Sequence, residues 1–252
     1  YLNKVPDLYM ATSWERDVIR PRVLGKFKDL LLATAQSPAM LFYLDNWQSA
    51  APGMVRPFAP PKQRKAGLNE NYGRELMELH TLGVHGGYTQ KDVQEVARCL
   101  TGWPTERHWP RGRFLFDPSR HDDGSKQVLG IFIPAGGGIT DGERVLDLLA
   151  AHPATADHLA RKLCLHFIGS SPAALARAVA RTFQASGGDI AALVRQILLS
   201  ADMVTAPPIL KRPLDFMTSA LRALDADTDC GLALQAHMEK MGQPLFAWPM
   251  PD

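Results

Sequence analysis

The chain has 252 residues, of which 46% are hydrophobic, so it can bury the core of one large domain or two small ones. Its 28 basic and 26 acidic side chains leave a net charge of +2, which does not favour a nucleic-acid binder or a membrane-surface binder. No apolar run approaches the roughly 20 residues of a membrane span, and no signal-peptide pattern opens the chain.

The cysteines do not indicate a thiolate metal site. Cys99, Cys164 and Cys230 are far apart and form no Cys-x-x-Cys pair. We expect each of them to lie within an apolar helical pattern, where a thiol packs as a small hydrophobic group. At most one disulfide could form, so the cysteine count does not identify the redox compartment.

Helical patterns begin early in the chain. Residues 14–36 carry apolar residues with a helical period, and Pro21 is expected to kink or split this helix. Ser37 and Pro38 then predict an N-cap and first turn of a short helix that ends near Asn46. A proline-rich loop follows at residues 48–67.

The middle of the chain combines helices with a small β element. The pattern predicts a helix over residues 69–82, a glycine stop at residues 85–87, and a variant capping box at residues 89–92 that opens the next helix. The alternating pattern at residues 113–133 predicts a small hairpin or irregular segment within an excursion over residues 113–138.

The remainder of the chain is predicted to be helical. Thr140 and Glu143 have the spacing of a capping box, and Pro153 is typical of a helix start. Further helices are predicted to begin near residues 171–172, at Asp189 and at Pro213. About nine helices therefore form a mainly α multi-helix bundle, a single domain over residues 1–252 with one minor β element.

The helix over residues 69–82 is the most polar of these elements. A helical wheel places Asn71, Glu75 and Glu78 on one face, whereas His80 lies about 140–160° away from the two carboxylates. The carboxylates could share a divalent ion or act as a general acid and base. The alternative is a structural face, with Arg74 and Glu78 as an ordinary i,i+4 ion pair.

A second polar cluster lies at residues 116–124. In this turn-rich segment, His121 and Asp122 are expected to be exposed and available as metal ligands, with His121 also a candidate acid–base group. The alternative is an Asx-type turn that leads into a strand at Lys126.

Several long motifs resemble one family. The sequences Asn-Glu-Asn-Tyr-Gly-Arg-Glu-Leu-Met-Glu-Leu-His-Thr-Leu-Gly-Val from Asn69, Gly-Tyr-Thr-Gln-Lys-Asp-Val from Gly87 and Ala-Arg-Cys-Leu-Thr-Gly-Trp from Ala97 are similar to those of the domain-of-unknown-function family 1800 (DUF 1800). Shorter matches, including Phe-Asp-Pro at Phe116 and Lys-Arg-Pro at Lys211, extend the resemblance over essentially the whole chain.

The resemblance implies a mainly helical, exported bacterial protein without an established activity, located in the periplasm or secreted. It also implies a partner in a sulfatase-like family, DUF 1501. Members usually have additional sequence at both ends, including an N-terminal Trp-His-Asn-His-like segment. If that segment supplies ligands, this chain holds half a site, completed by Glu75, Glu78, His80 or His121, and a fragment of its precursor could remain bound.

The leading hypothesis is a polar, metal-binding pocket formed by the 69–82 helix and the 116–124 loop. The catalytic groups would be Glu75, Glu78 and His121, and Arg74 and Asn71 would contact a cofactor or anion. A divalent metal would be held by residues from both segments, namely Glu75, Glu78, His80, His121 and Asp122. The alternative is a non-catalytic structural or assembly protein in which the charged residues form a buried salt-bridge network.

Overall fold

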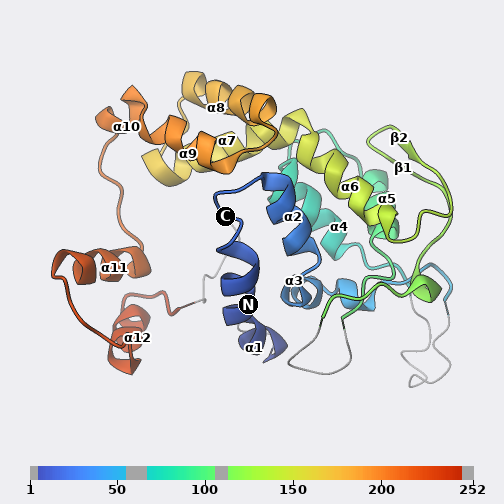
Figure 1. Ribbon diagram of the computed structural model, residues 1–252, viewed down its shortest axis with the longest axis horizontal. Helices are drawn as coiled ribbons and strands as arrows, with labels where there is room; N and C mark the ends of the chain where they lie inside the picture. Colours follow the sequence, from blue (N-terminus) through green and yellow to red (C-terminus); the bar gives the residue numbers. More distant parts are fainter. Residues whose placement is uncertain (1–4, 55–66, 106–112, 246–252) are drawn as a thin grey trace.

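The computed structural model describes residues 5–54, 67–105 and 113–245, and helices dominate these ranges (Figure 1). This confirms the predicted mainly α class, although the described residues form twelve α-helices where the sequence predicted about nine. The α-helices are α1 (Val5–Ser13), α2 (Phe27–Ala35), α3 (Pro38–Tyr43), α4 (Asn71–Glu75), α5 (Gln90–Cys99), α6 (Thr140–Ala151), α7 (Pro153–Ile168), α8 (Ala173–Ser186), α9 (Ile190–Leu198), α10 (Ala201–Thr205), α11 (Pro213–Ala223) and α12 (Leu232–Lys240).

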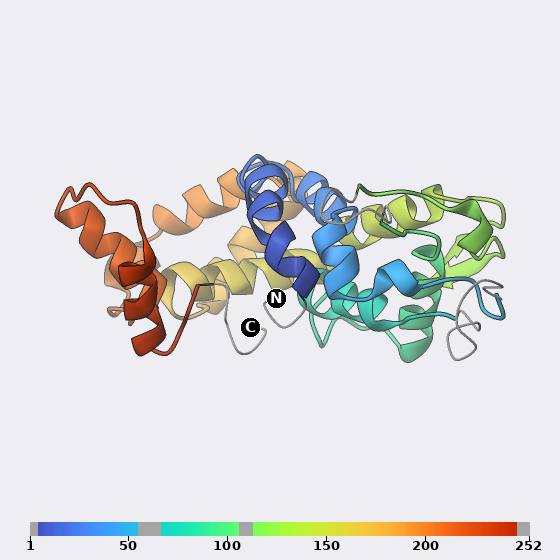
Figure 2. The same ribbon diagram turned by 90° about the horizontal axis from the view of Figure 1, so that it is seen from below.

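The molecule is elongated, with α11 and α12 at one end and α5, α6 and a small hairpin at the other (Figures 1 and 2). The long helix α7 packs against α6, α8, α9 and α10 between these ends. One hydrophobic cluster extends along the chain from Phe27 in α2 to Ile197 in α9. Helices α11 and α12 pack mainly against each other and contribute nothing to this cluster.

The predicted break at Pro21 is confirmed. A π-helical segment, η1 (Trp14–Ile19), ends before it, and α2 starts only at Phe27. The Phe27 N–H donates to the carbonyl of Gly188, at 2.8 Å, so the start of α2 is fixed by the turn between α8 and α9.

The predicted helix over residues 69–82 is present but is not a regular α-helix. Helix α4 continues into a π-helical segment, η4 (Leu76–Thr81), in which the Leu82 N–H donates to the carbonyl of Met77 five residues earlier, at 2.8 Å. Wider π turns displace side chains from their ideal α positions, and π segments are frequent at functional sites.

One of the two predicted capping boxes forms. The Thr89 hydroxyl accepts from the Asp92 N–H at the start of α5, and the Asp92 carboxylate accepts from the Thr89 N–H. The second prediction was wrong, because the N-cap of α6 is Ile139 and the Thr140 hydroxyl instead donates to the carbonyl of Gly137.

The predicted hairpin consists of β1 (Lys126–Val128) and β2 (Ile131–Ile133), which pair antiparallel with Lys126 opposite Ile133. In β1 the side chains of Lys126 and Val128 are buried and that of Gln127 is exposed. The hairpin packs on α5. A lysine therefore occupies the inward face of a strand.

The three thiols are all unpaired. Cys99 and Cys164 are buried in helices as predicted, whereas Cys230 is exposed in the loop between α11 and α12, so its predicted burial in a helix was wrong. Most of the proline-rich loop, residues 55–66, lies outside the described residues. Among the described helices, none combines the length and apolar character needed to cross a membrane.

Candidate functional site

The polar face of α4 and η4 contains four of the predicted site residues. Arg74 Nη2 donates to Gln90 Oε1 at 2.7 Å and lies 3.7 Å from Glu70 Oε2, so its ion pair is with Glu70 and not, as expected, with Glu78. The exposed Asn71 donates from Nδ2 to the carbonyl of Leu44 at 3.2 Å. Arg74 and Asn71 therefore have partners within the protein.

The two carboxylates on this face are half-buried neighbours. Burial, with a smaller contribution from the nearby Glu78 carboxylate, raises the pKa of Glu75. The Tyr88 hydroxyl lies 3.5 Å from Glu78 Oε2, and burial together with this carboxylate raises the pKa of Tyr88. A carboxyl group with a raised pKa beside a second carboxylate is a feature of acid–base sites as well as of structural clusters.

His80 lies on the same segment, η4, and its surroundings include α7. Its Nδ1 is buried and has no hydrogen-bond partner among the described residues. Burial, assisted by the nearby Lys162 ammonium on α7, lowers the pKa of His80 to about 4. His80 is therefore a neutral imidazole at the interface between η4 and α7.

His121 lies in a different part of the molecule. Its side chain is 1% exposed, so the expectation of an exposed histidine was wrong. It follows the short 3-10 helix η5 (Pro118–Arg120), where Asp117 accepts from the Ser119 N–H as in the predicted Asx-type turn. Its Nδ1 lies 2.9 Å from the carbonyl of Thr101, and its Nε2 lies 3.2 Å from Asp141 Oδ2.

Both nitrogens of the His121 ring lie against other protein groups. The Thr101 carbonyl at Nδ1 and the Asp141 carboxylate at Nε2 are both hydrogen-bond acceptors, so each is a suitable partner for a ring N–H. Asp141 also accepts from Lys126 at the same Oδ2 atom.

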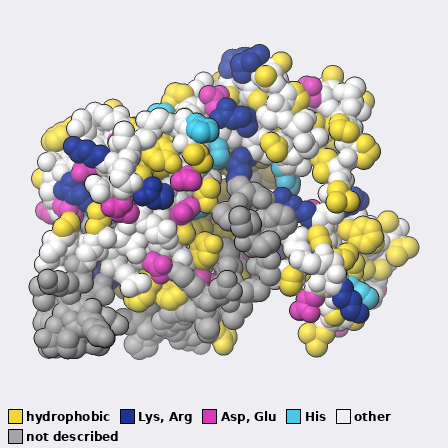
Figure 3. All heavy atoms as spheres, turned by 180° about the vertical axis from the view of Figure 1, so that it is seen from behind, with side chains coloured by type: hydrophobic (Ala, Val, Ile, Leu, Met, Phe, Trp, Pro, Cys, Tyr) yellow, Lys and Arg dark blue, Asp and Glu magenta, His cyan; other side chains and the backbone are white. Residues whose placement is uncertain are grey.

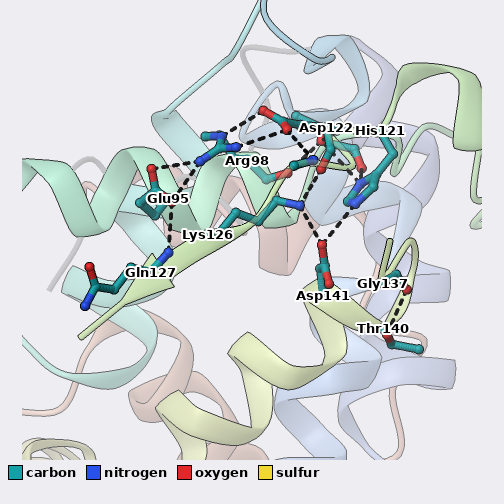
Figure 4. Close-up of polar contacts among 11 residues, drawn as sticks. Glu95, Arg98, His121, Asp122, Lys126, Gln127, Gly137, Thr140 and Asp141 are labelled. Atoms are coloured by element: carbon teal, nitrogen blue, oxygen red, sulfur yellow. Dashed lines mark hydrogen bonds and ion pairs between the residues drawn. The ribbon is translucent and has the colours of Figure 1, made fainter. Parts of the chain in front are cut away.

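Asp122, next to His121, belongs to an ion-pair network on α5. Arg98 donates from Nε to Asp122 Oδ2 at 2.7 Å and from Nη2 to Asp122 Oδ1 at 3.1 Å, and its Nη1 donates to Glu95 (Figure 4). The hydrogen bonds from Arg98 lower the pKa of Asp122 and raise that of Arg98. Glu95 in turn accepts from the backbone N–H of Gln127 at 3.0 Å, which holds β1 on α5.

The centre of this network is a fully buried ion pair. Lys126 Nζ lies 2.5 Å from Asp141 Oδ2, and the two side chains are 0% and 1% exposed. Lys126 Nζ also donates to the carbonyl of Asp122. The pair therefore joins β1, α6 and the segment that carries His121 (Figure 4). We refer to Glu95, Arg98, His121, Asp122, Lys126 and Asp141 as the charged network.

Two glycines allow these segments to meet. A Cβ on Gly102, whose φ is +73°, would lie 2.6 Å from the carbonyl oxygen of Asp117 and 3.1 Å from His121 Cβ. A Cβ on Gly137 would lie 1.9 Å from Asp141 Oδ1. Residues with side chains at these positions would separate the loop from α5 and α6.

The charged network has the chemistry of a structural element. Its central side chains, those of His121, Lys126 and Asp141, are shielded from water, and each interacts with another protein group. Cys99 lies close to Lys126 and Asp141, but burial raises the pKa of its thiol to about 12, so it is not a nucleophile at neutral pH.

The hydrogen bonds and ion pairs of the described residues do not join the two predicted halves of the pocket. Glu75, Glu78 and His80 lie on α4 and η4, whereas His121 and Asp122 bond to α5, β1 and α6, and no hydrogen bond or ion pair in the described ranges links the two groups. Within those ranges, no three or more His, Cys, Asp or Glu side chains are grouped so that they could hold a metal ion.

Four residues of the charged network were not predicted from the sequence as site residues, namely Lys126, Asp141, Arg98 and Glu95. A signal for Lys126 was available, because it shares the inward face of β1 with Val128, where an unpaired lysine would be very unfavourable. Asp141 resembled an ordinary acidic residue in the first turn of a helix. Only its contact with β1 distinguishes it.

The fold and the site together define a mainly α-helical protein with a buried charged network between a helix pair and a β hairpin. The chain belongs to the family described as "Protein of unknown function (DUF1800)", whose model matches residues 1–252. Neither a curated protein nor a solved structure matches it.

Proposed function

We propose that this protein is a non-catalytic structural or assembly protein, exported by a bacterial cell, in which the charged network fixes the relative positions of α5, α6 and the hairpin. The observation that carries the proposal is the burial of Lys126, Asp141 and His121, whose side chains are at most 1% exposed. A catalytic group must reach its substrate, whereas these groups contact only the protein.

The energetic logic of a buried network supports this role. Ion pairs removed from water seldom add much net stability, but a missing partner leaves a costly unpaired charge. Such a network therefore favours the one arrangement in which all partners meet. Export, and a partner from the DUF 1501 family, belong to the proposal through the family resemblance alone.

The test is elemental analysis of the purified native protein by mass spectrometry, together with the Glu78→Ala and His121→Ala variants. A structural protein will contain far less than one metal ion per chain, with no difference between the variants. Its His121→Ala variant will unfold at a lower temperature. Near-stoichiometric metal that disappears in either variant would overturn the proposal.

A second candidate function is an acid–base site at Glu75 and Glu78, favoured by the raised pKa of Glu75 and the neighbouring Tyr88 hydroxyl. It predicts activity in a hydrolase screen that Glu75→Gln abolishes while the fold stays intact. Glu239→Gln is the matched control, since it makes the same change at an exposed glutamate on α12. No activity in the native protein, or equal activity in both variants, would remove this candidate.

A further inference from the structure

Helices α11 and α12 form an arm, residues 213–240, that stands apart from the rest of the molecule (Figures 1 and 2). The connection to α10 is extended and exposed, and it is anchored where Ile209 lies against Gly169 at the end of α7. Two helices of this length bury too little apolar surface to be stable alone. The only buried side chain among the described residues of the arm is that of Met238.

The tip of the arm, residues 224–232, is both apolar and acidic. Leu224 and Leu232 are 77% and 82% exposed. Between them, all residues from 225 to 230 are exposed, and they include three aspartates and no basic residue, namely Asp225, Asp227 and Asp229. Figure 3 shows hydrophobic side chains over the surface of the arm.

A patch with the complementary character lies on α9 and α10. Arg195, Leu198 and Leu199 are exposed three and four residues apart at the end of α9, so they share one face of the helix. Val204 on α10 is 85% exposed. We refer to these four residues as the α9 patch.

The helix that packs on α9 also exposes basic residues. The neighbouring helix α8 exposes Arg177 and Arg181, and among the described residues neither of these, nor Arg195, forms an ion pair. The stretch from α8 to the end of α9 thus offers three unpaired guanidinium groups, the same number as the aspartates at the tip.

We infer that the tip of the arm binds the α9 patch of a second copy of this chain, which gives a two-fold symmetric dimer. The two surfaces are complementary in charge, three aspartates against three arginines, and both carry exposed leucines. Within one chain, both surfaces are exposed and so do not cover each other. A two-fold axis covers both at once, because each copy donates its tip and receives its partner's. The inference deepens the proposed assembly role and rests on it.

The test measures the mass of the purified full chain in solution by sedimentation velocity over a wide range of protein concentration. We expect a dimer at low ionic strength whose Kd rises with added salt. The Arg195→Glu and Asp227→Lys variants, each of which places like charges in the interface, should dimerise on the order of tenfold more weakly or worse.

Mixing the two variants gives the decisive test. A pair formed by one Arg195→Glu chain and one Asp227→Lys chain restores opposite charges at both contacts, so the equimolar mixture should form a heterodimer that neither variant forms alone. The matched control is Arg144→Glu, at an exposed residue of α6, a helix at the end of the molecule away from the arm (Figure 1). This variant should dimerise like the native chain. Thermal unfolding of each variant verifies the fold.

A native chain that is monomeric at every concentration and salt level, or a mixture that stays monomeric, would overturn the inference. So would binding of the arm to a different protein while the native chain remains monomeric. These results would leave the proposed structural function standing, because the metal content and the stability of the charged network are measured independently of dimerisation.

Discussion

Lys126 Nζ lies 2.5 Å from Asp141 Oδ2, and neither side chain is accessible to water. The two residues come from β1 and α6, which are separated in the chain by β2 and by the glycine-rich turn at residues 136–138. Because each charge is compensated mainly by the other, their contributions to stability are strongly coupled.

The Lys126→Met substitution should lower the free energy of unfolding by about 3–5 kcal/mol, since it leaves the Asp141 carboxylate buried without its ammonium partner. The double variant Lys126→Met/Asp141→Leu should lose less than Lys126→Met alone. Chemical denaturation measures the free energy of unfolding of the single and the double variant. Lys28→Met, at an exposed ion pair with Asp147, is the control and should leave the stability nearly unchanged, because water screens an exposed pair. Simple additivity of the single substitutions would contradict this coupling.

Stability should fall as the pH is lowered from about 6.5 to about 4, in part because of His80. Its pKa is about 4 in the folded protein and near 6.5 in the unfolded chain, so the unfolded chain binds the extra proton in this window. The contribution of His80 is therefore fully present above pH 6.5 and lost toward pH 4. This contribution of His80 to the stability is about 3 kcal/mol.

The His80→Gln variant should show a shallower decrease of stability over that pH range than the native protein. The exposed His85 offers a matched control, and His85→Gln should keep the native pH dependence. NMR titration of the His80 ring would measure its pKa directly, and a value near 6.5 would refute the prediction.

Thr89→Ala should destabilise the protein by about 1 kcal/mol, because it removes the side-chain cap of α5. Thr140→Ala is the matched test, since Thr140 has the same predicted motif but does not cap α6. We expect its effect on the midpoint of thermal unfolding to be clearly smaller. Equal losses from the two substitutions would mean that the capping geometry does not determine the stability of these helices.

Gly142→Ala should destabilise the protein by about 1–3 kcal/mol, although alanine is normally preferred within a helix. A Cβ at this position of α6 would lie 2.3 Å from Cζ2 of the fully buried Trp103. Gly67→Ala is the control, because no atom lies within 4 Å of the added Cβ. Denaturant unfolding measures this loss, and an unchanged free energy of unfolding in the variant would contradict the prediction.

The sequence by itself determined the features that depend on residues close together in the chain. The break at Pro21, the capping box at Thr89 and the starts of α7 and α11 at Pro153 and Pro213 were predictable, because proline geometry and local hydrogen bonds act over a few residues. The family was also predictable, since its motifs are continuous segments.

The tertiary structure alone decided which charged residues meet. His121 looked like an exposed loop residue, yet it contacts Thr101 and Asp141, each 20 residues away in the chain. Asp122 in the loop pairs with Arg98 on α5, and a helical wheel, which compares residues of one helix, could not reveal this contact. Such contacts depend on the packing of α5, α6 and β1, and local patterns of hydrophobicity carry no information about partners across elements.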